Sequence, residues 1–109
     1  MRKPKVYLTV LALAAAAFTL HAGDVQEIYD KSCVKCHGAD GKGDTKMGKK
    51  AEVKDFTDAK YQESFTDDKA FTAIKEGIKD GDKTKMKAAE DLTDADIKAL
   101  VAKVRSFKK

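Results

Sequence analysis

The chain has 109 residues, with 22 basic and 18 acidic side chains and a formal net charge of +4 at pH 7. This length predicts a single domain. The excess positive charge lies at the start of the chain, in Arg2, Lys3 and Lys5. Without residues 1–22 the chain keeps 19 basic and 18 acidic side chains, a net charge of +1. The composition therefore excludes a strongly basic nucleic-acid-binding domain.

The first 22 residues have the pattern of an export signal. A basic start is followed by a largely apolar stretch at 6–20 and by small residues around Ala22. This order is typical of a secretory signal peptide, and we expect cleavage after Ala22. The apolar stretch is short for a bilayer span, so an uncleaved membrane anchor is the less favoured alternative. The pattern predicts a signal peptide at 1–22 and a mature domain at 23–109, located in a bacterial periplasm without stable membrane insertion.

The mature chain contains little material for a hydrophobic core. Only 15 of its 87 residues are Leu, Ile, Val or Phe, and 37 are charged. That is about 17% core-forming residues, below the roughly 20% found at the lower end of globular domains. Such a chain buries too little apolar surface to offset its conformational entropy. The composition therefore predicts that a cofactor, metal or partner completes the fold.

Short helices and long loops are expected to alternate along the mature chain. Asp24 and Glu27 have the spacing of a capping box, and Val25, Ile28 and Tyr29 continue that helix on one face. Residues 38–48 include four glycines and predict a loop. A short helical turn is expected at 57–63.

The second half of the chain predicts two more helices. Thr66 can cap a helix that runs from Asp67 to about Ile78. Residues 77–87 are polar and predict a second loop. Thr93 and Asp96 begin the last helix, whose apolar stripe consists of Ile97, Leu100, Val101 and Val104. No strand pattern is present, so the predicted fold class is all-α.

Cys33, Cys36 and His37 have the C-x-x-C-H spacing of covalent haem attachment. Each thiol can form a thioether with one porphyrin vinyl group, and the three-residue step matches the gap between the two vinyls. The imidazole of His37 then lies beneath the iron as an axial ligand. The motif therefore predicts one covalently bound haem c.

Other uses of these residues are weaker hypotheses. A zinc site needs four ligands, and the mature chain offers only Cys33, Cys36 and His37 of the usual types. A thioredoxin-like C-x-x-C motif needs a βαβ context, which is absent. A disulfide between the two cysteines would close a very small loop and stabilise little.

Residues 24–107 resemble a class I c-type cytochrome of the short, single-haem periplasmic kind. The resemblance rests on the haem motif, the helix before it and the closing helix after a long loop. It implies a fold of short helices and loops around one haem, with a Met from the loop before the last helix as second iron ligand. Met86 fits that position. Met47, ten residues after His37, is the competing candidate, because reach alone does not exclude it.

Several features depart from the family pattern. No Pro follows the haem motif, so the acceptor for the second ring nitrogen of His37 is unassigned. No Trp is present to bind a propionate. Tyr29 matches the aromatic residue of the first helix, but Lys103 stands where the closing helix commonly has its aromatic partner. The mature chain's other aromatics are expected to form core and pocket walls: Phe56, Tyr61, Phe65 and Phe71.

The resemblance implies a monomeric electron carrier that passes one electron at a time between redox protein partners. It implies no enzymatic activity, because His37 and Met86 would fill both axial positions of the iron. The alternative is a haem enzyme or gas-binding sensor in which the Met ligand is labile or absent. The lysines near the motif and near Met86 form either a cationic rim for an acidic partner or ordinary surface: Lys35, Lys83, Lys85 and Lys87.

Overall fold

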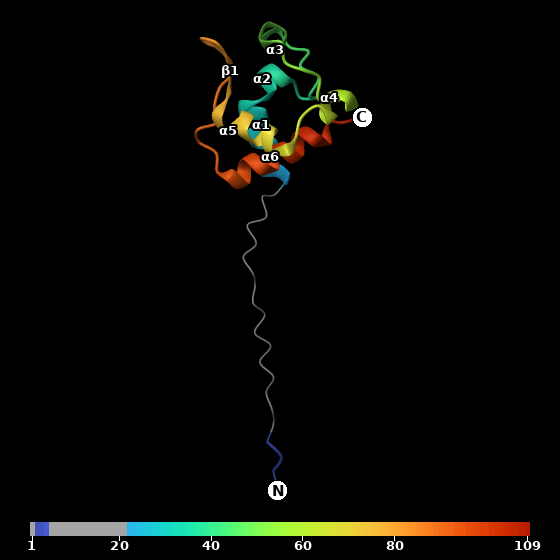
Figure 1. Cartoon of the computed structure of the whole chain (residues 1–109). Coiled ribbons are helices and arrows are strands. Elements are labelled where there is room, and N and C mark those ends of the chain that lie inside the picture. Colours follow the sequence, from blue (N-terminus) through green and yellow to red (C-terminus); the bar gives the residue numbers. More distant parts are fainter. Residues whose placement is uncertain (1, 5–21) are drawn as a thin grey trace.

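The computed structural model describes residues 2–4 and 22–109, so nearly all of the predicted signal peptide lies outside the described residues. The part of the chain after residue 21 folds into short helices and one small hairpin (Figure 1). No helix in the described ranges is long and apolar enough to cross a membrane. The elements in chain order are α1 Ala22–Ser32, α2 Val34–His37, α3 Lys46–Ala51, α4 Ala59–Glu63, α5 Asp67–Glu76, β1 Ile78–Asp80, β2 Lys83–Met86 and α6 Asp94–Ser106.

The predicted caps of the last two long helices are confirmed. The Thr66 side chain accepts a hydrogen bond from the backbone N–H of Lys69 at the start of α5. Thr93 and Asp96 form a complete capping box at the start of α6. The capping box expected at Asp24 is wrong, because α1 already begins at Ala22 and Asp24 lies within its first turn. An acidic side chain there still stabilises the helix through the helix dipole.

The loop predicted at 38–48 is wrong in its last part, where α3 begins. Thr45 caps this helix by accepting a hydrogen bond from Gly48 N at 2.8 Å. A Cβ atom on Gly48 would collide with the Cys36 carbonyl oxygen and would lie 2.6 Å from that of Gly43. Gly48 is therefore required for close packing of α3 on α2, whereas its poor helix propensity suggested a loop.

The loop predicted at 77–87 contains an antiparallel hairpin. β1 and β2 pair with Ile78 opposite Met86, and Gly81 at φ +60° lies in the turn. Most side chains of both strands are exposed, so the segment lacks the alternation of apolar and polar residues that marks a half-buried strand. The other regular elements of the described chain are all helices.

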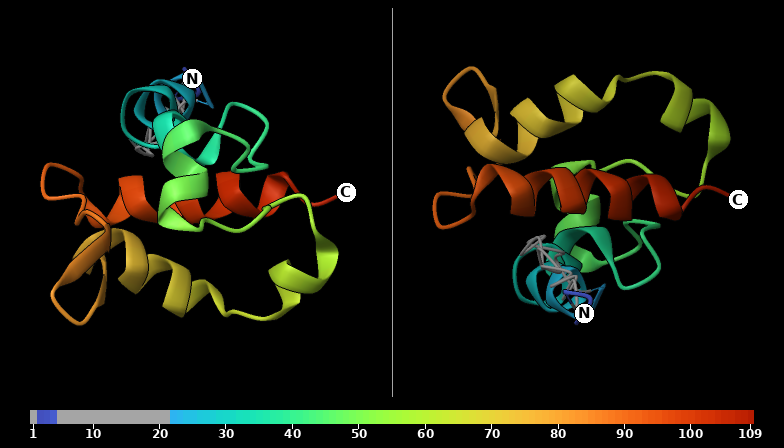
Figure 2. Two further views of the ribbon diagram at one scale, coloured as in Figure 1. Left: turned by 90° about the horizontal axis from the view of Figure 1, so that it is seen from above. Right: turned by 90° about the horizontal axis from the view of Figure 1, so that it is seen from below.

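The core lies where α6 packs against α1 and α5. Figure 2 shows α6 running along the molecule, with α1 on one side and α5 on the other. Tyr29, Ile97 and Leu100 are almost completely buried there. The aromatic partner of Tyr29 is Phe107, with ring centroids 5.4 Å apart, and the Lys103 ammonium lies over both rings. The departure noted at Lys103 is thus compensated by an aromatic residue after the end of α6.

A buried polar network attaches the segment around α4 to α6. The Gln62 side chain is 3% exposed, and its amide donates hydrogen bonds to the carbonyls of Phe56 and Val104 at 2.7 and 2.9 Å. The Arg105 guanidinium donates to the backbone and side-chain oxygens of Gln62 and to the Phe65 carbonyl. Most of these hydrogen bonds join residues about forty positions apart in the sequence. Such contacts leave no local pattern, so the sequence did not indicate this network.

Candidate functional site

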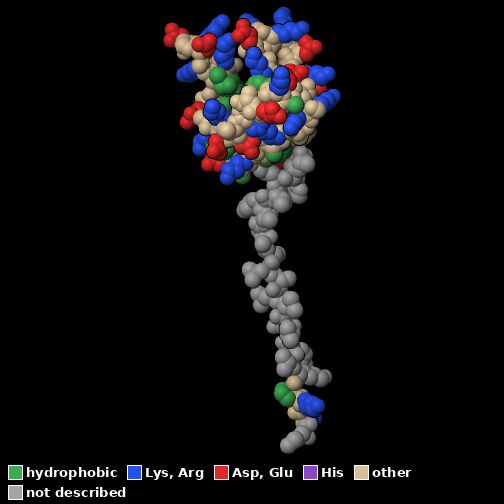
Figure 3. Space-filling model, turned by 45° about the vertical axis from the view of Figure 1, so that its right-hand side comes forward, with side chains coloured by type: hydrophobic (Ala, Val, Ile, Leu, Met, Phe, Trp, Pro, Cys, Tyr) green, Lys and Arg blue, Asp and Glu red, His purple; other side chains and the backbone are tan. Residues whose placement is uncertain are grey.

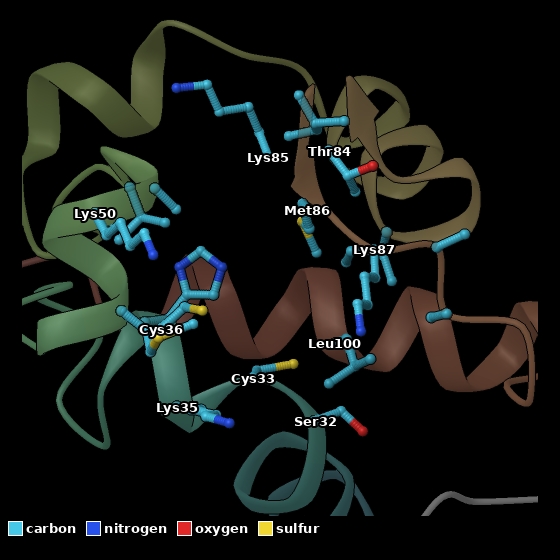
Figure 4. Close-up of a pocket in the computed structure, with 18 of the residues that line it drawn as sticks. Ser32, Cys33, Lys35, Cys36, Lys50, Thr84, Lys85, Met86, Lys87 and Leu100 are labelled. Carbon is cyan, nitrogen blue, oxygen red and sulfur yellow. The ribbon is translucent and has the colours of Figure 1, made fainter. Parts of the chain in front are cut away.

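A cavity of about 650 Å³ opens between the haem motif, α3, the hairpin and α6. Cys33 and Cys36 enter it from one side and Met86 from β2 on the other (Figure 4). His37 also lines it. Figure 3 shows apolar side chains at a hollow in a surface on which basic and acidic side chains are interspersed. A volume of about 300–1,000 Å³ is usual for a cofactor site.

A second cavity of about 280 Å³ shares Cys33, His37 and Met86 with the first. Phe56, Tyr61 and Phe65 are among its walls, as expected for these aromatics. Phe71 lines neither cavity and packs instead against the hydrophobic core. Residues of the haem motif and Met86 thus line both cavities, whose walls are largely apolar.

Tyr29 holds the haem motif at both ends. Its carbonyl accepts a hydrogen bond from Cys33 N at 2.8 Å, and its hydroxyl donates to the Gly38 carbonyl at 2.6 Å. Between these points the backbone makes one helical turn, closed by a bond from His37 N to the Cys33 carbonyl at 2.9 Å. This turn brings Cys33, Cys36 and His37 to the same cavity.

Cys33 and Cys36 form no disulfide, so both sulfur atoms are available for haem attachment. Burial, with a smaller contribution from Cys36, raises the pKa of Cys33 to about 11. Before haem attachment, Cys33 is therefore a protonated thiol near neutral pH. Two free thiols on one wall of an apolar cavity are the groups that thioether attachment of a porphyrin requires.

The His37 ring is a neutral imidazole held against an aromatic ring. Burial lowers the pKa of His37 below its usual value near 6.5, which favours the form that binds metals. The ring stacks on Phe56, with centroids 4.7 Å apart and planes inclined by 19°. Nδ1 of His37 is buried without a hydrogen-bond partner among the described residues. The acceptor for this nitrogen, which the absence of a Pro after the haem motif left unassigned, is therefore not found in the described part of the chain.

Met86 and Met47 reach the cavity from different elements. Met86 is half-buried on β2, lines both cavities and packs against the core. The backbone at Met86 passes close to Gly77, which has φ +77°. A Cβ atom on residue 77 would lie only 2.5 Å from the Met86 carbonyl oxygen. Met47 is 42% exposed on α3, the helix that packs against α2.

Lysines surround the mouth of the larger cavity. No acidic side chain is among the described residues that line it. Lys85 reaches across the opening toward α3, and its ammonium lies 3.6 Å from the Glu52 carboxylate (Figure 4). Lys50 belongs to the same rim, but the sequence did not single it out because it lay next to a predicted loop. The lining lysines are Lys35, Lys50, Lys83, Lys85 and Lys87.

Comparison with known proteins identifies the family. Residues 22–108 match the family model described as Cytochrome c. A similar solved structure, titled "KustC0563 c-type cytochrome", is 35% identical with a TM-score of 0.67 and covers 77% of this chain and 96% of its own. Another, of a mutant form of Kustc0563, is 33% identical with a TM-score of 0.66 and covers 78% and 99%. No curated protein matches the chain.

These findings confirm the predicted fold, a mostly helical cytochrome c fold, and the predicted cofactor. The two cysteines outside any disulfide, the neutral imidazole and the largely apolar cavity fit that cofactor. The chain belongs to the cytochrome c family and carries covalently bound haem c.

Proposed function

We propose that this cytochrome is a single-haem electron carrier in which Cys33 and Cys36 hold the porphyrin and His37 and Met86 bind the iron. When bound, the haem supplies one-electron chemistry by changing between ferrous and ferric states. The observation that carries the proposal is the arrangement of the haem motif and Met86 on different walls of one cavity. With His37 and Met86 both bound to the iron, no position would remain for a substrate.

Met86 is the better ligand candidate on packing grounds. It is anchored in the hairpin opposite Ile78, and the chain after it is fixed by a hydrogen bond from Ala89 N to the Ile74 carbonyl at 2.9 Å. Met47 lies on α3, which packs against the same helix that carries His37, and its side chain is more exposed. Met86 would therefore bind the iron from a different wall of the cavity than His37, which favours it as the second ligand.

The ligand set has a functional consequence. A thioether ligand favours ferrous iron, and apolar walls disfavour the extra positive charge of ferric iron. Both effects raise the reduction potential. Ligands that stay bound in both oxidation states also keep structural change on electron transfer small, as a carrier requires.

The test is the optical spectrum of the ferric holoprotein. Met86→Ala should abolish the red sulfur-to-iron charge-transfer band, and Met47→Ala should leave it intact. Loss of the band in Met47→Ala would reverse the ligand assignment. High-spin ferric features and ready CO binding in the unaltered protein would support the haem enzyme or gas sensor instead.

We also propose that the protein is exported to the periplasm and cleaved after Ala22. The segment before Ala22 has the signal pattern, and the family match begins at residue 22. Haem-loaded protein isolated from the periplasmic fraction should therefore have an intact mass that starts at Gly23. A mass that includes residues 1–22 would contradict cleavage.

The rim of lysines points to a redox partner with an acidic surface. Five lysines and no acidic residue line the cavity, with Glu52 beside Lys85 at its edge, although the mature chain as a whole is nearly neutral. The two exposed large hydrophobic side chains of the described residues, Met47 and Ile78, line the same cavity. An apolar centre with a cationic border suits brief docking of an acidic protein.

Electron transfer with an acidic redox protein should therefore slow as ionic strength rises. Lys50→Glu should slow it at low salt more than Lys98→Glu, an exposed change on α6 away from the cavity. Equal effects of the two variants would show that the rate depends on the net charge of the protein and not on the lysines of the rim.

Sedimentation analysis of the holoprotein should show a monomer.

A further inference from the structure

No group of the described residues supplies the ring of His37 with the hydrogen bond that usually orients a metal-binding histidine. Such a histidine almost always donates its second ring N–H to a carboxylate, a carbonyl or water, and that bond fixes the plane of the ring. Here Nδ1 is the only buried side-chain nitrogen or oxygen of the described residues without a partner. Some other contact must therefore hold the ring plane.

Phe56 makes that contact. Its ring lies nearly parallel to the His37 ring at a centroid distance of 4.7 Å, which is a stacked arrangement. The Phe56 side chain is only 8% exposed, so the surrounding core limits its movement. The rings of Tyr61 and Phe107 lie at 6.2 and 6.3 Å from it, with planes inclined by 19° and 16°.

The backbone of Phe56 is fixed on both sides. Its N–H donates to the Gly41 carbonyl at 2.8 Å, and its carbonyl accepts from the Gln62 amide at 2.7 Å. Gln62 is in turn bound by Arg105 of α6. A continuous set of contacts thus runs from α6 through Gln62 and Phe56 to the His37 ring.

We propose that Phe56 is the positioning residue of the axial histidine and that stacking on Phe56 sets the plane of the His37 ring in place of a hydrogen bond. This inference rests on the proposed role of His37 as iron ligand. An imidazole without an acceptor at Nδ1 is less electron-rich than one that donates a hydrogen bond. The arrangement therefore orients the ligand without strengthening it as an electron donor to ferric iron.

The first test uses the unaltered ferrous holoprotein and needs no substitution. In its NMR spectrum the ring protons of His37 should be shifted far to high field by the porphyrin ring current, which checks the ligand role by itself. The Nδ1 proton should lack the deshielding of a hydrogen-bonded N–H, and should show nuclear Overhauser contacts to the Phe56 ring. A strongly deshielded Nδ1 proton would overturn the inference while leaving the ligand role intact.

The second test compares three variants as ferric holoproteins. Unpaired spin reaches the four haem methyl groups unequally, and the pattern follows the plane of the axial imidazole. Phe56→Leu removes the flat ring and should change the spread or order of the methyl resonances, whereas Phe56→Tyr keeps the ring and should preserve them. Phe71→Leu removes a phenylalanine that lines neither cavity and should also preserve them.

An unchanged methyl pattern in Phe56→Leu, or an equal change in Phe71→Leu, would refute the positioning role. If Phe56→Leu does not accumulate with haem attached, the ferrous measurements on the unaltered protein decide the question. Absence of the high-field His37 ring protons would instead contradict the proposed function. The two failures are therefore distinguishable.

Discussion

Replacement of Arg105 by Met should destabilise the holoprotein far more than loss of a surface charge. The side chain donates hydrogen bonds to the carbonyls of Gln62 and Phe65 and to the side-chain oxygen of Gln62, and its guanidinium lies 4.3 Å from the centre of the Phe65 ring. Met keeps the apolar stem but leaves both carbonyls without their charged donor. The change also removes the ion pair with Asp67, whose carboxylate is 73% exposed.

The size of the effect follows from these contacts. The three lost hydrogen bonds, to the Gln62 carbonyl, the Gln62 side-chain oxygen and the Phe65 carbonyl, cost about 0.5–1 kcal/mol each in this part-buried position. The cation–π contact adds roughly 0.5–1 kcal/mol. The exposed ion pair with Asp67 adds at most about 0.5 kcal/mol after screening by solvent. We expect a loss of about 3 kcal/mol, which corresponds to a fall in Tm of roughly 12 °C or more for a domain of this size.

The assay is guanidinium unfolding of the ferric holoprotein near neutral pH, followed by far-UV circular dichroism and haem absorbance. Arg105→Lys should have a free energy of unfolding between those of Arg105→Met and the unaltered protein, because an ammonium cannot reproduce the planar set of guanidinium donors. Lys49→Met breaks an ion pair in which both side chains are 73% exposed, and is the matched control. A loss of about 0.5 kcal/mol or less in Arg105→Met, as for an ordinary surface change, would refute the reasoning.

Three further predictions concern the haem motif and its supports. Gly48→Ala should lower the free energy of unfolding by about 2 kcal/mol or more, because the new Cβ atom would collide with the Cys36 carbonyl. Gly81→Ala is the control: residue 81 has φ +60°, and a Cβ atom on it would meet no other atom within 4 Å. This change should lower the free energy of unfolding by only about 1 kcal/mol. Burial raises the pKa of Tyr29. The unfolded chain therefore loses that proton first, and stability should fall as pH rises above about 10. Tyr29→Phe should flatten this decline, and an equal slope in both proteins would exclude Tyr29 as its source. A Cys33→Ala, Cys36→Ala protein made without haem should show no cooperative thermal transition by circular dichroism, since the core is thin; a native-like melt would contradict this.

Features written in a few adjacent residues could be predicted from the sequence. The haem motif is a contiguous pentapeptide, and its cofactor was confirmed by the family match. The caps at Thr66 and Thr93 each depend on side chains within three residues of the helix start, so short-range spacing was sufficient. The apolar stripe of the last helix, including Ile97 and Leu100, was correct for the same reason, because its period is that of the helix itself.

Features that depend on distant parts of the chain were decided only by the tertiary structure. Local propensity favours a loop at Gly48, yet the residue lies in α3. The helix packs against the Cys36 carbonyl there, and this contact requires a residue without a side chain. The hairpin at 78–86 also depended on the tertiary structure, because its mostly exposed strands lack the alternation of apolar and polar residues that predicts a strand. Neither the stack of Phe56 on His37 nor the bonds from Arg105 to Gln62 can be read from spacing, because such contacts form only when separate segments meet around the haem cavity.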